Sequence, residues 1–148
     1  MAEIIEKNVE SLNPKFKVAV VDVPWPTYLR EMEAGRLPIF FIGWIEDYHH
    51  PHNWVTPYMA SHGTFSSWQN LPEEFYKKAD ELIAEAVKLP PEEAHAKYAE
   101  LQKLAMDYVI DIFGVQPIGR HYEQLWVKGW YYNPAYFGPW FYVLSKGQ

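Results

Sequence analysis

The sequence contains no cysteine, which excludes a disulfide scaffold, a thiolate nucleophile and a cysteine-bound zinc. No run of about 18 apolar residues is present, so no segment is expected to span a membrane. Basic residues are the minority, with 13 Lys and Arg against 19 Asp and Glu, and no basic stripe exists. Binding of nucleic acid through its phosphates is therefore not expected. The first ten residues are charged and amphipathic, unlike a secretory signal, so we expect any export address to lie outside this sequence.

What the sequence has in excess is aromatic rings. Aromatic residues make up 18% of the 148 residues and include 7 Trp and 11 Tyr. Trp and Tyr join a large apolar area to a polar tip, which suits ligand surfaces and interfaces as well as cores. The length predicts one ordinary domain over residues 1–148 with room for a core.

The first third of the chain predicts an α/β fold. Residues 3–12 have the apolar spacing of a helix, and residues 16–23 and 39–44 are short and rich in β-branched or aromatic residues, as buried strands are. Between the two strands we expect a short helix capped by Thr27 and ended by Gly35. A strand, a helix and a strand predict a right-handed β-α-β unit with parallel strands, whose carboxyl ends meet at one sheet edge.

The rest of the chain predicts a loop, a helical hairpin and closing strands. Residues 45–72 have little periodicity and are expected to form a long functional loop. A helix is predicted from Leu71 to Lys88 and a longer one from Pro91 to about Ile112, packed as an antiparallel hairpin. The inward faces are predicted to be Phe75, Ala79, Leu82, Ile83 and Ala86 in the first helix, and Ala94, Tyr98, Leu101, Ala105, Tyr108 and Ile112 in the second. The predicted closing strands are 115–118, 125–130 and 141–146.

Histidines gather in the loop and raise the possibility of a metal site. His49, His50 and His52 lie within four residues and His62 follows, and neutral imidazoles suit Zn, Cu or Ni. Adjacent residues on an extended loop point to opposite sides, however, and no H-E-x-x-H spacing is present. Solvated loop histidines are the favoured interpretation, and a small metal-binding protein is kept as an alternative function.

Catalysis has little support in the sequence. There is no G-x-S-x-G motif and no glycine-rich phosphate loop, and the neighbouring acids Glu46 and Asp47 would diverge on an extended segment. We expect no catalytic residues, no cofactor and no enzyme activity.

A ligand cleft is the remaining interpretation of the segment GWIEDYHHPHNW, residues 43–54. Asp47 follows the second predicted strand and is flanked by Trp44 and Tyr48, so it could bind an ammonium group of a ligand. The rings, with Trp54 at the end of the segment, could add cation–π attraction. A local turn or cap made by Asp47 explains the residue types equally well.

The same segment resembles the family 5 extracellular solute-binding proteins, which are the oligopeptide- and dipeptide-binding components of ABC importers. In that family a second strand ends in G-W-x-x-D-Y-x-x-P, which here is Gly43, Trp44, Asp47, Tyr48 and Pro51. The tail VKGWYYNPAYFGPWFYVLSKG is similar to the family's closing segment, in which V-x-G-W-x-x-N-P precedes a last strand.

The resemblance covers essentially the whole chain but only the C-terminal portion of the family's length. It implies part of the C-terminal lobe of a two-lobed, periplasmic-binding-protein-like fold, with the N-terminal lobe as a missing partner. It also implies transport without catalysis, delivery of a solute to an ABC permease in the membrane, and a periplasmic or extracellular location. We expect the isolated lobe to bind ligand weakly and to self-associate through its uncovered aromatic face.

Residue by residue, the resemblance implies that Asp47 holds the α-ammonium group of a peptide and that Trp44 lies beneath the ligand. Two departures stand out. The family often has D-Y-P-D-P where this chain has histidines at 49 and 50, and some oligopeptide binders carry an arginine at the position of Phe41. Other members bind cello-oligosaccharides, nickel complexes or opines, so an oligosaccharide receptor is a further alternative.

Overall fold

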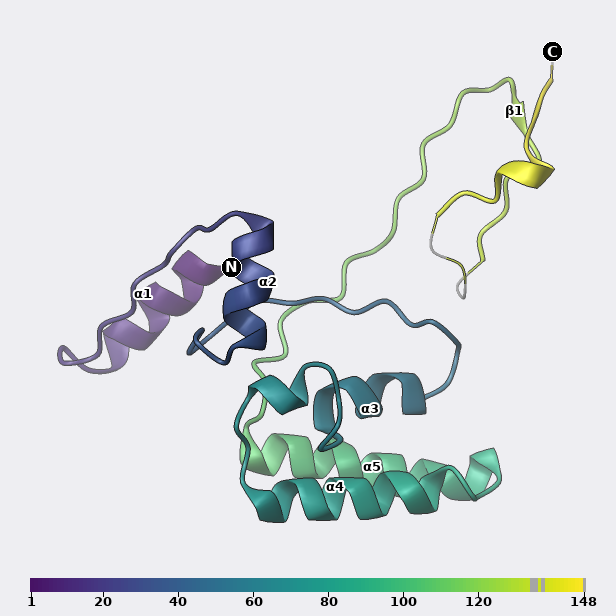
Figure 1. The fold of residues 1–148 in the computed structure, drawn as a ribbon. Coiled ribbons are helices and arrows are strands. Elements are labelled where there is room, and N and C mark those ends of the chain that lie inside the picture. Colours follow the sequence, from purple (N-terminus) through teal and green to yellow (C-terminus); the bar gives the residue numbers. More distant parts are fainter. Residues whose placement is uncertain (134–135, 137, 148) are drawn as a thin grey trace. The chain divides into compact units, whose positions relative to one another are not determined.

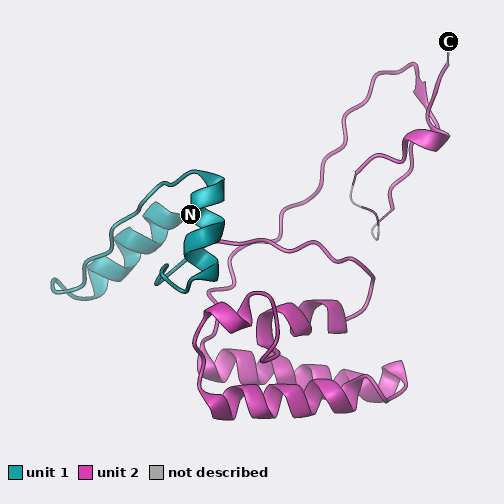
Figure 2. Cartoon of the chain, in the orientation of Figure 1, with its two compact units in different colours: residues 1–40 teal, residues 41–148 magenta. Residues whose placement is uncertain are grey.

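The computed structural model describes residues 1–133, 136 and 138–147, which fall into two compact units. Residues 1–40 form unit 1 and residues 41–148 form unit 2, coloured teal and magenta in Figure 2. Each unit is treated by itself. A single domain over 1–148 therefore stays a prediction.

Unit 1 contains two helices, α1 (Ala2–Leu12) and α2 (Trp25–Glu33) (Figure 1). The amphipathic helix predicted over 3–12 is confirmed, although none of its residues is buried. The short helix is confirmed too, but Thr27 lies inside it and does not cap it, because the helix already starts after Pro24. Gly35 follows it with φ of +63°, the left-handed conformation that glycine adopts at little cost.

The strands predicted over 16–23 and 39–44 are not found in the structure. A parallel strand pair is stable only in a sheet covered on both faces, and no such sheet exists in the described ranges. Val21, Ile39 and Phe41 are accordingly exposed instead of buried between layers. The predicted β-α-β unit is therefore wrong for the described residues, whereas the two-lobed fold stays a prediction.

Unit 2 is built on three helices and a 3-10 turn: α3 (His52–Met59), η1 (Ser66–Trp68), α4 (Glu73–Ala86) and α5 (Pro91–Tyr108). The antiparallel hairpin of α4 and α5 is confirmed, and α3 lies against it (Figure 1). The segment 45–72 is not one long loop, since α3 and η1 occupy part of it. Pro51 precedes the first helical residue of α3, and Val55 and Met59, one turn apart, face the hairpin.

The core of unit 2 is the interface of these helices. All five predicted positions of α4 are buried, as are four of the six predicted for the second helix. Tyr108, the last residue of α5, is 37% exposed, and Ile112 lies beyond the helix, because Val109 with its φ of +50° turns the chain out of it. The buried members are Val55, Met59, Ala60, Phe75, Ala79, Leu82, Ile83, Ala86, Ala94, Tyr98, Leu101, Leu104 and Ala105.

The tail contains one short antiparallel pair, β1 (Val127–Lys128) with β2 (Ser145–Lys146), and the 3-10 turn η2 (Phe141–Val143). Two of the predicted strands thus shrink to two residues each, and residues 115–118 form none. The glycine of the V-x-G-W-x-x-N-P run, Gly129, has φ of +89°, and a Cβ there would lie 2.0 Å from the carbonyl oxygen of Val143. Only glycine fits at this point; Pro134 of the same run lies outside the described residues.

None of the helices in the described ranges combines the length and the apolar character that crossing a bilayer requires.

Candidate functional site

Residues 44–54 of unit 2 contain the four side chains that the sequence analysis selects, Trp44, Asp47, Tyr48 and Trp54. Residues 44–51 are irregular, and residues 52–54 begin α3. The segment is therefore attached to the helical core through Val55 and Met59, which are buried in it.

One buried amide joins two of these residues. Asn53 is 6% exposed, and its Oδ1 accepts a hydrogen bond from the indole Nε1–H of Trp44 at 3.1 Å and from the backbone N–H of Asp47 at 2.9 Å. Each of the two hydrogen bonds is worth about 0.5–1.5 kcal/mol net. Asn53 therefore holds the indole nitrogen of Trp44 and the backbone nitrogen of Asp47 on the same amide oxygen.

The sequence analysis missed Asn53. Its signal was the proline two residues before it. A helix that starts directly after Pro51 places Asn53 in the first turn, where an amide side chain can hydrogen-bond neighbouring backbone groups.

The carboxylate of Asp47 is exposed. Its Oδ2 lies 3.5 Å from Nδ2 of Asn53, at the outer limit of a hydrogen bond. The side-chain oxygen that receives the backbone N–H of Asp47 belongs to Asn53, so the local turn is closed by the asparagine. The side chain of Asp47 therefore does not cap its own backbone N–H, and its role toward a ligand stays a prediction.

Trp44 is half-buried and forms the edge of an aromatic cluster. Its ring meets Phe65 edge to face, with centroids 5.7 Å apart, and Phe65 also contacts Tyr58 at 4.9 Å and Trp68 at 5.6 Å. Such pairs are worth about 0.5–1.5 kcal/mol each beyond the area they bury. The indole beside Asp47 is consequently held on two sides, by Asn53 at its nitrogen and by Phe65 at its ring.

Tyr48 stacks on His52 with the ring centroids 6.2 Å apart, and its hydroxyl shares a hydrogen bond with Nδ1 of the same histidine. The pKa of His52 is lowered from 6.5, first by burial and then by the nearby charges of His50 and His62. A neutral imidazole can accept a hydrogen bond from the tyrosine hydroxyl, whereas an imidazolium cannot. Tyr48 is therefore anchored to α3, one residue away from the acid.

Trp54 is directed to a different carboxylate. Its Nε1–H donates to Oε2 of Glu46 at 3.0 Å, while Oε1 of Glu46 lies 2.7 Å from Nδ1 of His49. The structure brings Trp44, Asp47 and Tyr48 into one connected segment but turns the nitrogen of Trp54 toward Glu46. Glu46 itself, missed as a structural residue, links the loop to the first turn of α3.

The contacts of Glu46 predict a pH-dependent anchor. Its pKa is lowered from 4.5, first by the hydrogen bond from His49 and then by the one from Trp54. Because the folded-state pKa lies below the unfolded one, this stabilisation is complete above about pH 4.5 and is lost as the pH falls through the lowered value. We expect the indole N–H resonance of Trp54 to shift with a midpoint below 4.5, measured by NMR titration.

Glu46→Gln, which keeps an acceptor oxygen but cannot ionise, is the control, and it should abolish that step. A midpoint at or above pH 4.5 would contradict the anchoring role of Glu46.

The histidines of the segment are committed to separate partners. His49 contacts Glu46, the Nδ1 of His50 accepts the backbone N–H of His52 at 3.1 Å, and His52 contacts Tyr48. Nowhere in the described part of the chain do three or more potential ligands converge as a metal ion requires. The geometry gives no support to the alternative of a histidine metal site.

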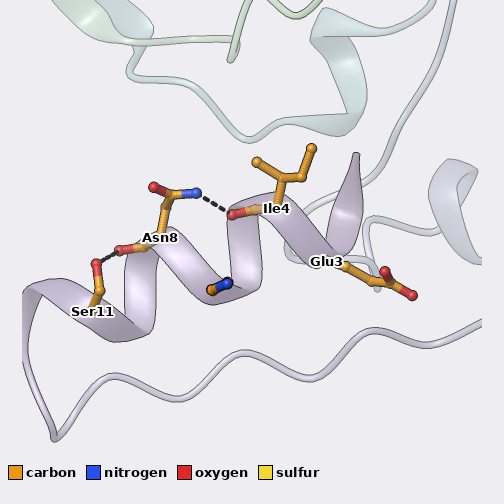
Figure 3. A pocket seen from close by; sticks show the side chains of 5 residues that line it. Glu3, Ile4, Asn8 and Ser11 are labelled. Carbon is orange, nitrogen blue, oxygen red and sulfur yellow. Dashed lines mark hydrogen bonds between the residues drawn. The ribbon is translucent and has the colours of Figure 1, made fainter.

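Unit 1 has a shallow, open pocket on α1, lined by Glu3, Ile4, Lys7, Asn8 and Ser11 (Figure 3). The polar groups of two lining residues are used within the helix: Asn8 Nδ2 donates to the carbonyl of Ile4 and Ser11 Oγ to that of Asn8, both at 2.7 Å. The pocket belongs to a single exposed helix and contains none of the candidate residues.

Comparison with known proteins finds similarity to a peptide-binding protein at low identity. The chain is similar to di/tripeptide-binding protein 1 of Pseudomonas aeruginosa (strain UCBPP-PA14), with 25% identity over 136 residues. The match covers 78% of this chain but only 25% of the other protein, so the chain spans about a quarter of that protein's length. No protein-family model matches the chain, and no solved structure matches it. The chain is thus similar, at low identity and over part of its length, to a protein described as binding di- and tripeptides.

Proposed function

We propose that this chain is the ligand-binding part of a substrate-binding protein that delivers peptides to an ABC permease. The observation that carries the proposal is the exposed carboxylate of Asp47, positioned beside the indole of Trp44 through Asn53. Similarity to a protein named for binding di- and tripeptides supports the same ligand class.

The arrangement fits the amino end of a peptide. An α-ammonium group can donate to the carboxylate of Asp47, and the neighbouring indole offers an apolar face for the first residue of the ligand. A charge-assisted hydrogen bond of this kind is worth about 1.5–3 kcal/mol when water is excluded. Asp47 is exposed in the described residues, so strong binding needs a second wall, which we assign to the remainder of a two-lobed protein.

In the same proposal, residues 16–23 and 39–44 pair with strands of the remainder of the two-lobed protein. Both segments are rich in apolar residues that are exposed in the present structure, among them Val21 and Phe41. Pairing in a covered sheet would bury them. In this proposal the protein works outside the cytoplasmic membrane, in the periplasm or at the cell surface, and has no catalytic role.

Isothermal titration calorimetry of the gene's complete product tests the function. We expect heat of binding with Ala-Ala and Ala-Ala-Ala and none with cellobiose or cellotriose. Binding of the sugars without the peptides would replace the proposal by an oligosaccharide receptor. Absence of binding to either class would overturn it.

A further inference from the structure

Asn53 is one of two buried polar side chains among the described residues, together with Ser66. The hydroxyl of Ser66 donates to main-chain carbonyls, those of Ala60 and Gly63. Asn53, in contrast, contacts two of the residues assigned to the ligand, and through three different atoms of them: the indole nitrogen of Trp44 and the backbone nitrogen and Oδ2 of Asp47. A residue needed for the fold alone would not have to make these particular contacts.

The amide group has a chemistry that the contacts use in full. Its oxygen accepts two N–H groups, and its nitrogen presents a donor to the carboxylate of Asp47. An alanine provides neither function. An aspartate keeps the accepting oxygens but replaces the donor by a second negative charge about as close to Asp47 as the 3.5 Å of the present contact.

The position of Asn53 is itself fixed by the core. It lies in the first turn of α3, two residues before Val55 and six before Met59, and both of these are buried against the helical hairpin. The amide is thus mounted on a packed element, whereas Asp47 lies on irregular chain. A site on irregular chain needs such support to keep its geometry.

We propose that Asn53 is the positioning residue of the ammonium site: it sets where the Asp47 carboxylate stands relative to the Trp44 indole, and so determines the preference for ligands with a free amino terminus. The proposal rests on the proposed peptide-binding function and adds to it a residue that contacts no ligand. Asn53 acts through Asp47 and Trp44.

The test compares two peptides, Ala-Ala and N-acetyl-Ala-Ala, on the gene's complete product and its Asn53→Ala variant. We expect the ratio of their dissociation constants, which measures the preference for a free amine, to fall about tenfold in the variant although Asp47 is present. Ser66→Ala is the matched control, because it removes the other buried polar side chain and should lower thermal stability without changing the ratio.

A second variant separates positioning from stability. Asn53→Asp keeps acceptors for both N–H groups, so the indole resonance of Trp44 should stay protected from solvent exchange, as in the parent and unlike in Asn53→Ala. Two adjacent carboxylates hold a shared proton more tightly than one. The preference for the free amine should then fall between roughly pH 7 and pH 5 by about tenfold more in this variant than in the parent.

The other titratable groups around the site are Glu46, Tyr48, His49, His50, His52, His62 and, from α5, Tyr98. All are present in both proteins, so their contributions cancel in the comparison. Peptide binding by the parent with an unchanged ratio in Asn53→Ala would overturn the positioning role while leaving the proposed function intact. A parent that binds neither peptide would overturn both.

Discussion

Asp47→Asn is expected to weaken the binding of peptides with a free amino terminus by roughly ten- to a hundredfold and to leave N-acetylated peptides almost unaffected. The substitution preserves the shape of the side chain and the backbone N–H that Asn53 accepts, at 2.9 Å, and removes only the negative charge. The loss corresponds to about 1.5–3 kcal/mol, the value of a charge-assisted hydrogen bond. Calorimetry with Ala-Ala and N-acetyl-Ala-Ala on the complete gene product measures it.

The neighbouring acid provides the control. Glu46→Gln removes a charge one residue away, but that carboxylate is already bound by His49 and Trp54. It should therefore affect the two peptides alike. An equal loss for both peptides in Asp47→Asn, or a larger selective loss in Glu46→Gln, would remove Asp47 from the binding site.

Phe75→Ala is expected to lower the free energy of unfolding of unit 2 by about 3–5 kcal/mol. The ring of Phe75 is completely buried in α4, and it touches Tyr76 and Tyr108 edge to face, with centroids 5.8 and 5.3 Å apart. Its removal costs transfer free energy and leaves a cavity that neighbouring helices fill only partly. Domains are stable by about 5–15 kcal/mol in total, so the variant should be close to unfolding at room temperature.

Urea denaturation followed by circular dichroism at the helical band gives the change. The same substitution at Phe113, whose side chain is 65% exposed, is the matched control and should alter stability by no more than about 0.5 kcal/mol. Equal effects at the two positions would show that the α4–α5 interface is not the main source of stability in unit 2.

The helices were predictable because their signals are local. Apolar residues recur at helical spacing in 73–86 and 91–108, Pro91 opens the second of them, and glutamates stand at both amino ends. Burial follows directly from that spacing, as Phe75, Leu82 and Leu101 illustrate. Helix α3 was missed because its eight residues contain an internal proline, Pro57, and its two apolar contacts are recognisable only once the hairpin is present.

The strands were not predictable in the same way, because a strand is defined by its neighbour. Residues 16–23 and 39–44 have the composition of buried strands, but the described residues offer them no partner. The only strand pair in the described ranges joins Val127 to Lys146, and there the left-handed Gly129 and its contact with Val143 were visible in the sequence only as a glycine within a motif.

The sequence by itself determined the helical hairpin, the position of the acid among aromatic residues, and the resemblance that assigns Asp47 and Trp44 to a ligand. These depend on residue type and spacing along the chain. Tertiary structure alone decided that the indole N–H of Trp54 donates to Glu46 and that the histidines contact separate partners. It also decided that buried Asn53 connects the indole of Trp44 to Asp47. The reason is physical: these contacts join residues two to nine positions apart on irregular or helical chain. Their direction is set by how α3 packs on α4 and α5, which no local pattern encodes.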